Sequence, residues 1–321
     1  MADGMGSTIG VDLGATKVAT VLLGDGGRIL ATDRRPTGAE RGISPVISTV
    51  LDSVRAVTRQ SSEPVRAAGV GVAAQVDLNG SIRFAPNLRW RNVALGDELS
   101  RELRLPVTLL NDVRAATLAE WKHGAGQGER DLVCLFLGTG LGGGVVSGGR
   151  LLIGDANAAG ELGHLTVQKG GRRCTCPNSG CLEAYVSGWA LAERARETAS
   201  ADPASAASLQ RRAGGSLERV DAGMVIELAR SGDAFSSHLL EETRDYLAAG
   251  LVGIANAFNP RLILGGGGLL EGTPELFDGA FEAARPSMLP SVADHVRCAH
   301  AALGGNAVAL GAAAWARGEG Q

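Results

Sequence analysis

The sequence predicts an α/β protein built from two lobes, and three observations lead to this fold class. The chain has 321 residues, which is long for one hydrophobic core. Short apolar runs typical of buried strands alternate with longer segments whose apolar residues have helical spacing. Residues 8–31 and 132–153 share one plan: a buried strand, a turn of Gly and Thr, a second strand, a Gly-rich hairpin and a third strand. We therefore expect an internal duplication.

The first lobe is expected to begin with strands and to continue with alternating helices and strands. Short apolar runs separated by turns predict strands at residues 8–11, 18–23, 28–31, 67–73 and 107–110. Apolar residues at helical spacing predict helices at residues 43–58 and 95–103. The lobe should span residues 1–113 and be completed by a C-terminal helix at 307–321.

The second lobe, expected at residues 114–306, starts in a similar way. Apolar runs and glycine turns predict strands at residues 132–137, 143–147, 150–153 and 261–264, and a buried helix at 246–257. The segment 195–215 is rich in Ala, Ser and Arg and is expected to be a helical insertion. Its role is not indicated by the sequence.

Composition excludes several classes of function. Apolar residues make up 45% of the chain and charged residues 20%, with a net charge of −3, which favours a folded protein over a nucleic-acid-binding one. We expect no secretory signal and no membrane span, because the N-terminus lacks an apolar core and no apolar run approaches 18 residues. A cytoplasmic location follows, in which the five cysteines are reduced or bound to metal.

Two Gly- and Thr-containing turns follow buried strands at matching places in the two lobes. Small residues let backbone N–H groups approach phosphate oxygens, Thr adds a hydroxyl donor, and a carboxylate at a strand end can hold Mg²⁺. Each turn alone could be an ordinary hairpin, but together they indicate one polyphosphate. No P-loop motif is present. The expected phosphate-site residues are Asp12, Gly14, Thr16, Lys17, Gly138, Thr139 and Gly140.

Asn111-Asp112 ends a predicted strand and opens a helix that runs through Glu120. Phosphoryl transfer to an alcohol needs a carboxylate that accepts the hydroxyl proton, and Asp112 at a strand end is suited to that role. Either residue can also cap the helix N-terminus, which does not exclude catalysis.

His164, Cys174, Cys176 and Cys181 place four soft ligands within eighteen residues. This spacing is typical of a closed tetrahedral zinc site of structural type. The alternatives are a disulfide, such as Cys176 to Cys181, or solitary buried thiols. Beside these motifs lie Asn87, Glu161 and Glu183. Amides and carboxylates of this kind bind sugar hydroxyls, although each alone is more often a surface residue.

Taken together, these motifs resemble the ROK family of sugar kinases and repressors, and within it the bacterial glucokinases. The resemblance covers nearly the whole chain. It is carried by the following segments: Asp12 to Lys17, Pro86-Asn87-Leu88-Arg89-Trp90, Asn111-Asp112, Leu137 to Gly144, Glu161-Leu162-Gly163-His164 and Cys174-x-Cys176-x₄-Cys181-Leu182-Glu183. Two departures are Gln75, where a small residue is frequent, and Arg114, where Asn is common.

The resemblance implies an actin-like ATPase fold with two ribonuclease-H-like lobes around a central cleft. It implies ATP, Mg²⁺ and a structural Zn²⁺, with Asp112 as the catalytic base. The sugar ligands would be Asn87, Asn111, Asp112, Glu161, His164 and Glu183, and the adenosine side of the nucleotide would meet Gly265, Gly266 and Gly267. Family kinases are usually dimers or tetramers, so we expect a homo-oligomer.

We therefore expect an ATP-dependent glucokinase that phosphorylates the 6-hydroxyl of glucose. Fructose, mannose, allose or N-acetylmannosamine are alternative substrates, because the shared motifs recognise a pyranose without fixing its stereochemistry. A non-catalytic sugar-responsive regulator is less expected, because eleven residues before Asp12 are too few for a winged-helix domain. Polyphosphate is an alternative phosphate donor.

Overall fold

The structure of the protein is a computed structural model, and it describes residues 6–320. The described chain forms two compact units, with residues 6–132, 144–160 and 301–320 in the first and residues 133–143 and 161–300 in the second. The chain therefore passes between the units four times. The lobe boundary expected at residue 113 lies within a helix, α3 (Asp112–His123).

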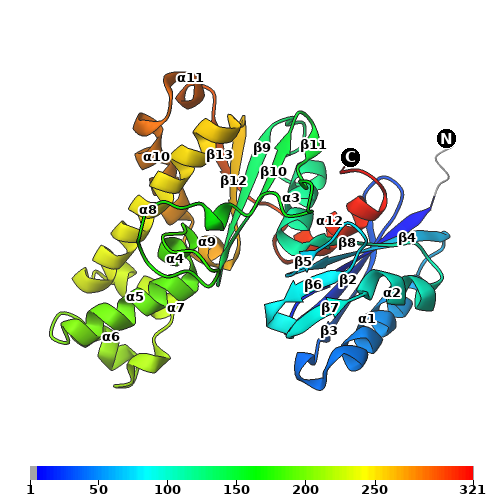
Figure 1. Ribbon diagram of the computed structural model, residues 1–321, viewed down its shortest axis with the longest axis horizontal. Helices are drawn as coiled ribbons and strands as arrows, with labels where there is room; N and C mark the ends of the chain where they lie inside the picture. The colour runs from blue at the N-terminus through cyan, green and yellow to red at the C-terminus, as the bar shows by residue number, and fades with distance from the viewer. Residues whose placement is uncertain (1–5, 321) are drawn as a thin grey trace. The chain divides into compact units, whose positions relative to one another are not determined.

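The first unit is organised around a five-stranded sheet with the order β3-β2-β1-β4-β8 (Figure 1). The strands are β1 (Ser7–Leu13), β2 (Lys17–Leu23), β3 (Ile29–Pro36), β4 (Val65–Val72) and β8 (Val107–Asn111). β1, β2 and β3 form an antiparallel meander, whereas β1, β4 and β8 are parallel. Leu13, Val72 and Asn111 lie in one row, so the carboxyl ends of the three parallel strands meet at one edge.

Two helices make the most extensive helix contacts with this sheet. α1 (Ile43–Thr58) has the bounds that the sequence predicts, and it buries one apolar stripe against β2 and β3. α12 (Ala307–Ala316) packs on β1 and β4 and against α3. The approach is so close that a Cβ atom at Gly10 would overlap the carbonyl of Ala309, and one at Gly69 would overlap that of Ala312. Glycine is therefore required where this helix crosses the strands.

A small three-stranded sheet with the order β5-β6-β7 also belongs to the first unit. Its strands are β5 (Gln75–Val76), β6 (Ile82–Ala85) and β7 (Trp90–Val93), and the 3₁₀ turn η2 (Pro86–Leu88) joins the last two. Trp90, the first residue of β7, is buried, and helix α2 (Leu95–Leu103) follows the sheet. The sheet therefore presents the predicted sugar loop on a packed base.

A second five-stranded sheet has the order β11-β10-β9-β12-β13. Its strands are β9 (Leu132–Leu137), β10 (Leu141–Ser147), β11 (Arg150–Leu151), β12 (Leu262–Gly266) and β13 (Arg297–His300). The strand order repeats that of the first sheet, with a hairpin on one side and a parallel pair on the other. This repetition confirms the internal duplication and the two-lobed α/β fold.

The rest of the second unit is mostly helical. Its helices are α4 (Glu183–Val186), α5 (Gly188–Ala201), α6 (Ala207–Arg212), α7 (Ala222–Arg230), α8 (Ala234–Phe258), α9 (Gly268–Gly272), α10 (Pro274–Ala284) and α11 (Pro290–Ala293). The segment 195–215 is formed by the end of α5, a turn and α6, as the prediction of a helical segment requires. No helix in residues 6–320 is long and apolar enough to cross a membrane.

Candidate active site

The carboxyl edge of the first sheet carries two carboxylates. Asp12 is the penultimate residue of β1, and Asp112 is the first residue of α3, directly after β8. Asn111 caps that helix as predicted, because its Oδ1 accepts hydrogen bonds from the N–H groups of Val113 at 3.0 Å and Arg114 at 3.2 Å. The cap fixes the backbone from which Asp112 projects.

The two carboxylates influence each other's charge. Burial, together with the negative charge of Asp112, raises the pKa of Asp12 to about 6, although Lys17 and Arg34 oppose the shift. A buried carboxylate beside a second one is costly to ionise unless a cation is bound between them. Oxygen ligands are those preferred by Mg²⁺, so this part of the first unit fits a divalent cation.

The turn after β1 is held rigidly and leaves its Thr side chain in solvent. Gly14 donates its N–H to the carbonyl of Lys17 at 3.0 Å. Thr37 reinforces the turn from the end of β3, donating its hydroxyl to the carbonyl of Gly14 at 2.7 Å and its N–H to that of Thr16 at 3.0 Å. Thr16 is exposed. The turn thus presents a hydroxyl from a fixed backbone, as a phosphate site needs.

The predicted sugar loop lies on the small sheet of the first unit. Asn87 is exposed at the centre of η2, which ends at Arg89 in a left-handed conformation with φ of 58°. Gln75 is exposed on β5 and pairs with Phe84. Asn111 Nδ2 lies 3.5 Å from the carbonyl of Ala74, so the start of this small sheet is adjacent to the cap of α3. Asn111 and Asp112 thus lie beside the sheet that carries Asn87.

In the second unit, the turn after β9 is joined to the start of α5. Gly138 donates to the carbonyl of Gly140 at 3.0 Å, which closes the turn. The first amides of α5, from Gly188 and Trp189, donate to the carbonyls of Gly138 and Thr139 at 2.9 and 3.1 Å. The positive end of the helix dipole therefore lies beside the exposed Thr139, which favours an anion.

A cavity of about 840 Å³ opens beside this turn, within the second unit. It is lined by Gly138 and Thr139 and by residues of α5, α7 and α9. The volume is typical of a nucleotide-sized ligand site. The turn after β9 therefore borders a cavity large enough for a nucleoside.

The glycine run at residues 265–268 contributes to this cavity through its last member. Gly268 lines the cavity, whereas Gly265 and Gly266 are buried inside β12. A Cβ atom at Gly265 would contact the ring of Phe277 at 2.7 Å, and Gly267 has φ of 91° beside the backbone of Leu137. Gly265 and Gly267 thus allow close packing of the strand and turn.

Most of the cavity wall was not identified from the sequence. Its remaining residues include Trp189, Arg196, Asp221, Glu227 and Arg230. They come from α5 and from α7 with its N-cap, and the sequence pattern of both is that of ordinary amphipathic helices. Local signals are the caps of the two helices: Ser187 Oγ accepts from the N–H of Ala190 at the start of α5, and Asp221 Oδ1 accepts from the N–H of Met224 at the start of α7.

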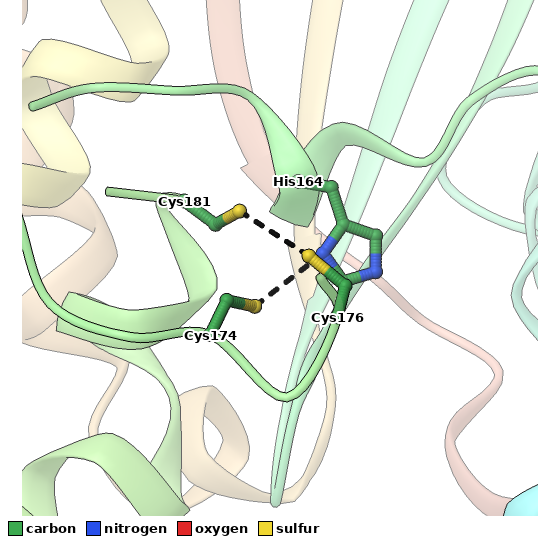
Figure 2. A group of neighbouring side chains, drawn as sticks. All are labelled: His164, Cys174, Cys176 and Cys181. Atoms are coloured by element: carbon green, nitrogen blue, oxygen red, sulfur yellow. Dashed lines mark hydrogen bonds between the residues drawn. The ribbon is translucent and has the colours of Figure 1, made fainter. Parts of the chain in front are cut away.

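The four predicted metal ligands converge on one point. The ligand atoms of His164, Cys174, Cys176 and Cys181 all lie within 4.8 Å of one another. Figure 2 shows the four side chains pointing toward one another. Cys174 Sγ lies 3.7 Å from His164 Nδ1, and the sulfur atoms of Cys176 and Cys181 are 3.6 Å apart. Sulfur ligands 2.3 Å from a tetrahedral zinc ion would be separated by roughly 3.8 Å. All five cysteines are free thiols, so the arrangement fits zinc rather than the alternative disulfide.

Glu183 links the loop that carries Cys174 and Cys176 to the turn after β9. Its side chain is buried, and Oε2 accepts from the N–H of Leu141, directly after the turn, at 2.9 Å. Oε1 accepts from the hydroxyl of Thr175, in the metal loop, at 3.3 Å. Glu161 and His164, the other two sugar ligands expected here, are exposed in and next to the 3₁₀ turn η3 (Leu162–His164). Glu183 therefore has a structural task that the sequence did not indicate.

Known proteins resemble this chain over nearly its full length. The sequence model of the ROK family matches residues 8–319. A glucokinase of Thermotoga maritima is 36% identical over 95% of both chains. The solved structure of a ROK family glucokinase from Streptomyces griseus, in complex with glucose and AMPPNP, is 35% identical, covers 98% of this chain and 100% of its own, and has a TM-score of 0.80. A xylose repressor of Bacillus spizizenii is 27% identical over 95% of this chain and 76% of its own.

Proposed function

We propose, from the premise that the chain belongs to the ROK family, that it transfers the terminal phosphate of ATP to the 6-hydroxyl of glucose. The observation that carries the proposal is the position of Asp112. It opens a capped helix at the carboxyl edge of the first sheet, next to the carboxylate of Asp12. A general base and a cation ligand are the two groups that phosphoryl transfer to an alcohol requires.

Each step is assigned to residues of this chain. Asp112 accepts the proton of the 6-hydroxyl while the hydroxyl oxygen attacks the γ-phosphorus of ATP. The bond from that phosphorus to the β,γ-bridging oxygen breaks, and ADP leaves. Asn87, Asn111, Glu161, His164 and Glu183 bind the sugar hydroxyls and orient them. A bound Mg²⁺ neutralises phosphate charge, and Asp12 is the residue that would hold it.

The nucleotide is assigned to the two turns and the cavity. Thr16 and Thr139 donate hydroxyl groups to its phosphates, and the 840 Å³ cavity takes the nucleoside. The dipole of α5 adds a favourable field for the phosphates. A nucleoside-sized cavity beside the second turn favours ATP over polyphosphate, which has no nucleoside to fill it.

His164, Cys174, Cys176 and Cys181 are proposed to bind one structural Zn²⁺. All four positions are taken by protein ligands, so the ion has no open position for catalysis. Its role is to hold the loop that carries His164 and Thr175 in a fixed shape. The dimer or tetramer implied by the family resemblance stays a prediction, to be tested by light scattering.

The test is an ADP-release assay with glucose, fructose, mannose, allose and N-acetylmannosamine. We expect glucose to give the highest kcat/KM, and Asp112→Asn to lower kcat by at least ~10²-fold because the proton acceptor is lost. Nucleotide binding to the variant, measured by calorimetry, should be unchanged. Absence of ADP release with every hexose would overturn the proposal, and faster turnover of another hexose would reassign the substrate. Near-normal turnover in Asp112→Asn would remove Asp112 as the base.

A further inference from the structure

Helix α3 is part of the first unit. It contacts residues of that unit that lie close in sequence to each of the four points where the chain passes from one unit to the other. Before the first passage, Trp121 Nε1 donates to the carbonyl of Glu129 at 2.7 Å. After the second, Gly144 is packed so closely on Thr117 that a Cβ atom would overlap the threonine hydroxyl. Thus two of the passages are flanked by direct contacts to one helix.

The third passage, between residues 160 and 161, is preceded by a buried hydrogen-bond network. Arg114, only 1% exposed, donates from Nη1 to Asn157 Oδ1 and from Nη2 to the carbonyl of Asn157, both at 2.7 Å. Asn157 in turn donates from Nδ2 to the carbonyl of Val76 on β5 at 3.0 Å. Arg114 thus joins α3 to the segment 144–160, and Asn157 joins that segment to the small sheet that carries the proposed sugar loop.

The fourth passage, between residues 300 and 301, is followed by a second buried network. Glu120 is fully buried, and its Oε1 accepts from the N–H groups of Ala302 at 2.9 Å and Leu303 at 2.8 Å. Its Oε2 accepts from the N–H of Ala125 at 3.0 Å. A buried carboxylate that accepts three backbone hydrogen bonds holds its partners firmly.

The contacts come from one helix: Arg114, Thr117 and Trp121 are spaced three and four residues apart, and Glu120 directly precedes Trp121. That helix begins with Asp112. We infer that Arg114 and Glu120 are positioning residues for phosphoryl transfer. Their hydrogen bonds connect α3, which presents the proposed base, to Asn157 before the third passage and to Ala302 and Leu303 after the fourth. The inference rests on the proposed function. Because a misplacement of about 1 Å at a reacting group can cost ~10²-fold in rate, loosening these ties should lower kcat.

Asn157→Gly is the sharpest variant. Asn157 has φ of 52°, which glycine adopts without strain, so the variant removes the side-chain bonds to Arg114 and Val76 and keeps the turn. Arg114→Lys is the second variant, since an ammonium cannot reproduce the bidentate geometry. The matched control is Arg194→Lys in the second unit. Arg194 is also buried, on α5, and donates to the carbonyls of Tyr185 and Leu239 and to the hydroxyl of Thr243.

Steady-state kinetics with glucose and urea unfolding are measured on all variants. We expect Asn157→Gly and Arg114→Lys to lower kcat at least about tenfold while the KM for ATP changes less than about twofold. Arg194→Lys should lose comparable stability and keep kcat within about twofold. Equal losses of kcat in the variants and the control would overturn the inference, because the networks would then act only through stability. Wild-type protein without turnover would overturn the proposed function and the inference together.

Discussion

The turn after β1 and the turn after β9 occupy the same position in sheets of the same strand order, but they are equipped differently. The first combines an exposed threonine with Asp12 and Lys17 and lies beside Asp112. The second, Gly138 to Gly140, carries no charged side chain and borders a large cavity and the N-terminus of α5. Under the proposed function, the duplicated backbone provides two places for phosphate, with charged side chains at the first turn and a cavity for the nucleoside at the second.

The metal sites follow the same division. The first unit offers carboxylate oxygens, which suit a hard ion such as Mg²⁺, at the edge of its sheet. The second unit offers thiols and an imidazole, which suit zinc, in a loop that Glu183 connects to the turn after β9. Under the proposed function, the oxygen ligands would exchange Mg²⁺ with each substrate, whereas the closed set of soft ligands would fix the shape of the loop.

The largest expected effect that distinguishes the two turns is the free-energy cost of ionising Asp12 in the folded state. The pKa of Asp12 is raised from 3.8 to about 6, mainly by burial, so the folded state disfavours its ionised form. The contribution of Asp12 to folding stability is fully present below about pH 4, where the side chain is protonated. It is lost as pH rises through about 6, where the side chain ionises in the folded state. A shift of about 2 units corresponds to at most about 3 kcal/mol. Without Mg²⁺, Asp12→Asn should therefore be more stable than wild type above pH 6, and equally stable below pH 4.

Urea unfolding in EDTA between pH 3.5 and 8 measures this difference. Thr139→Val, in the second turn, is the control and should show no pH-dependent gain. Added Mg²⁺ should reduce the advantage of Asp12→Asn, because the cation compensates the carboxylate only in wild type. A stability difference that is flat across the pH range would contradict the electrostatic description of the first turn.

The comparison also shows what the sequence could and could not predict. The bounds of α1 and α2 were predicted to the residue, because their apolar spacing is a local property. The grouping of His164 with Cys174, Cys176 and Cys181 was predicted correctly, because the four residues lie within eighteen positions of the sequence. The strand β13 was missed, because its four residues are exposed or half-buried and carry no apolar pattern.

The nucleoside cavity and the second role of Glu183 depend on tertiary packing. The cavity exists only where α5, α7 and α9 come together, and nothing in each helix alone indicates a wall. Glu183 was predicted to bind sugar from its place in a motif, whereas its bonds to Leu141 and Thr175 depend on the fold. Local patterns therefore predict elements and clustered ligands, and they do not predict surfaces shared by distant segments.

A smaller effect tests the metal loop of the second unit. Asn178 Nδ2 lies 3.3 Å from Cys181 Sγ and 2.9 Å from Thr166 Oγ1, so it can donate to a thiolate ligand. Partners of metal ligands typically contribute 10–100-fold to metal affinity, and we expect Asn178→Ala to weaken Zn²⁺ binding by roughly tenfold. Competition with a chromophoric chelator measures the affinity. Thr166→Val, which removes only the other partner of Asn178, should change it much less, and equal affinities in Asn178→Ala and wild type would show that this contact does not stabilise the thiolate.

The smallest expected effect compares the two turns directly, through the same change of a hydroxyl to a methyl group. Thr139 borders the nucleoside cavity, so Thr139→Val should weaken ADP binding by about 1 kcal/mol, or about fivefold, which is typical of one lost hydrogen bond. Thr16, on the carboxylate-bearing turn of the first unit, is expected to act on the phosphate that is transferred. Thr16→Val should therefore leave ADP affinity within about twofold and lower kcat by about fivefold. Calorimetry with ADP and steady-state kinetics separate the two effects. If both variants weaken ADP binding equally, the two turns share one task and the proposed division between them is wrong.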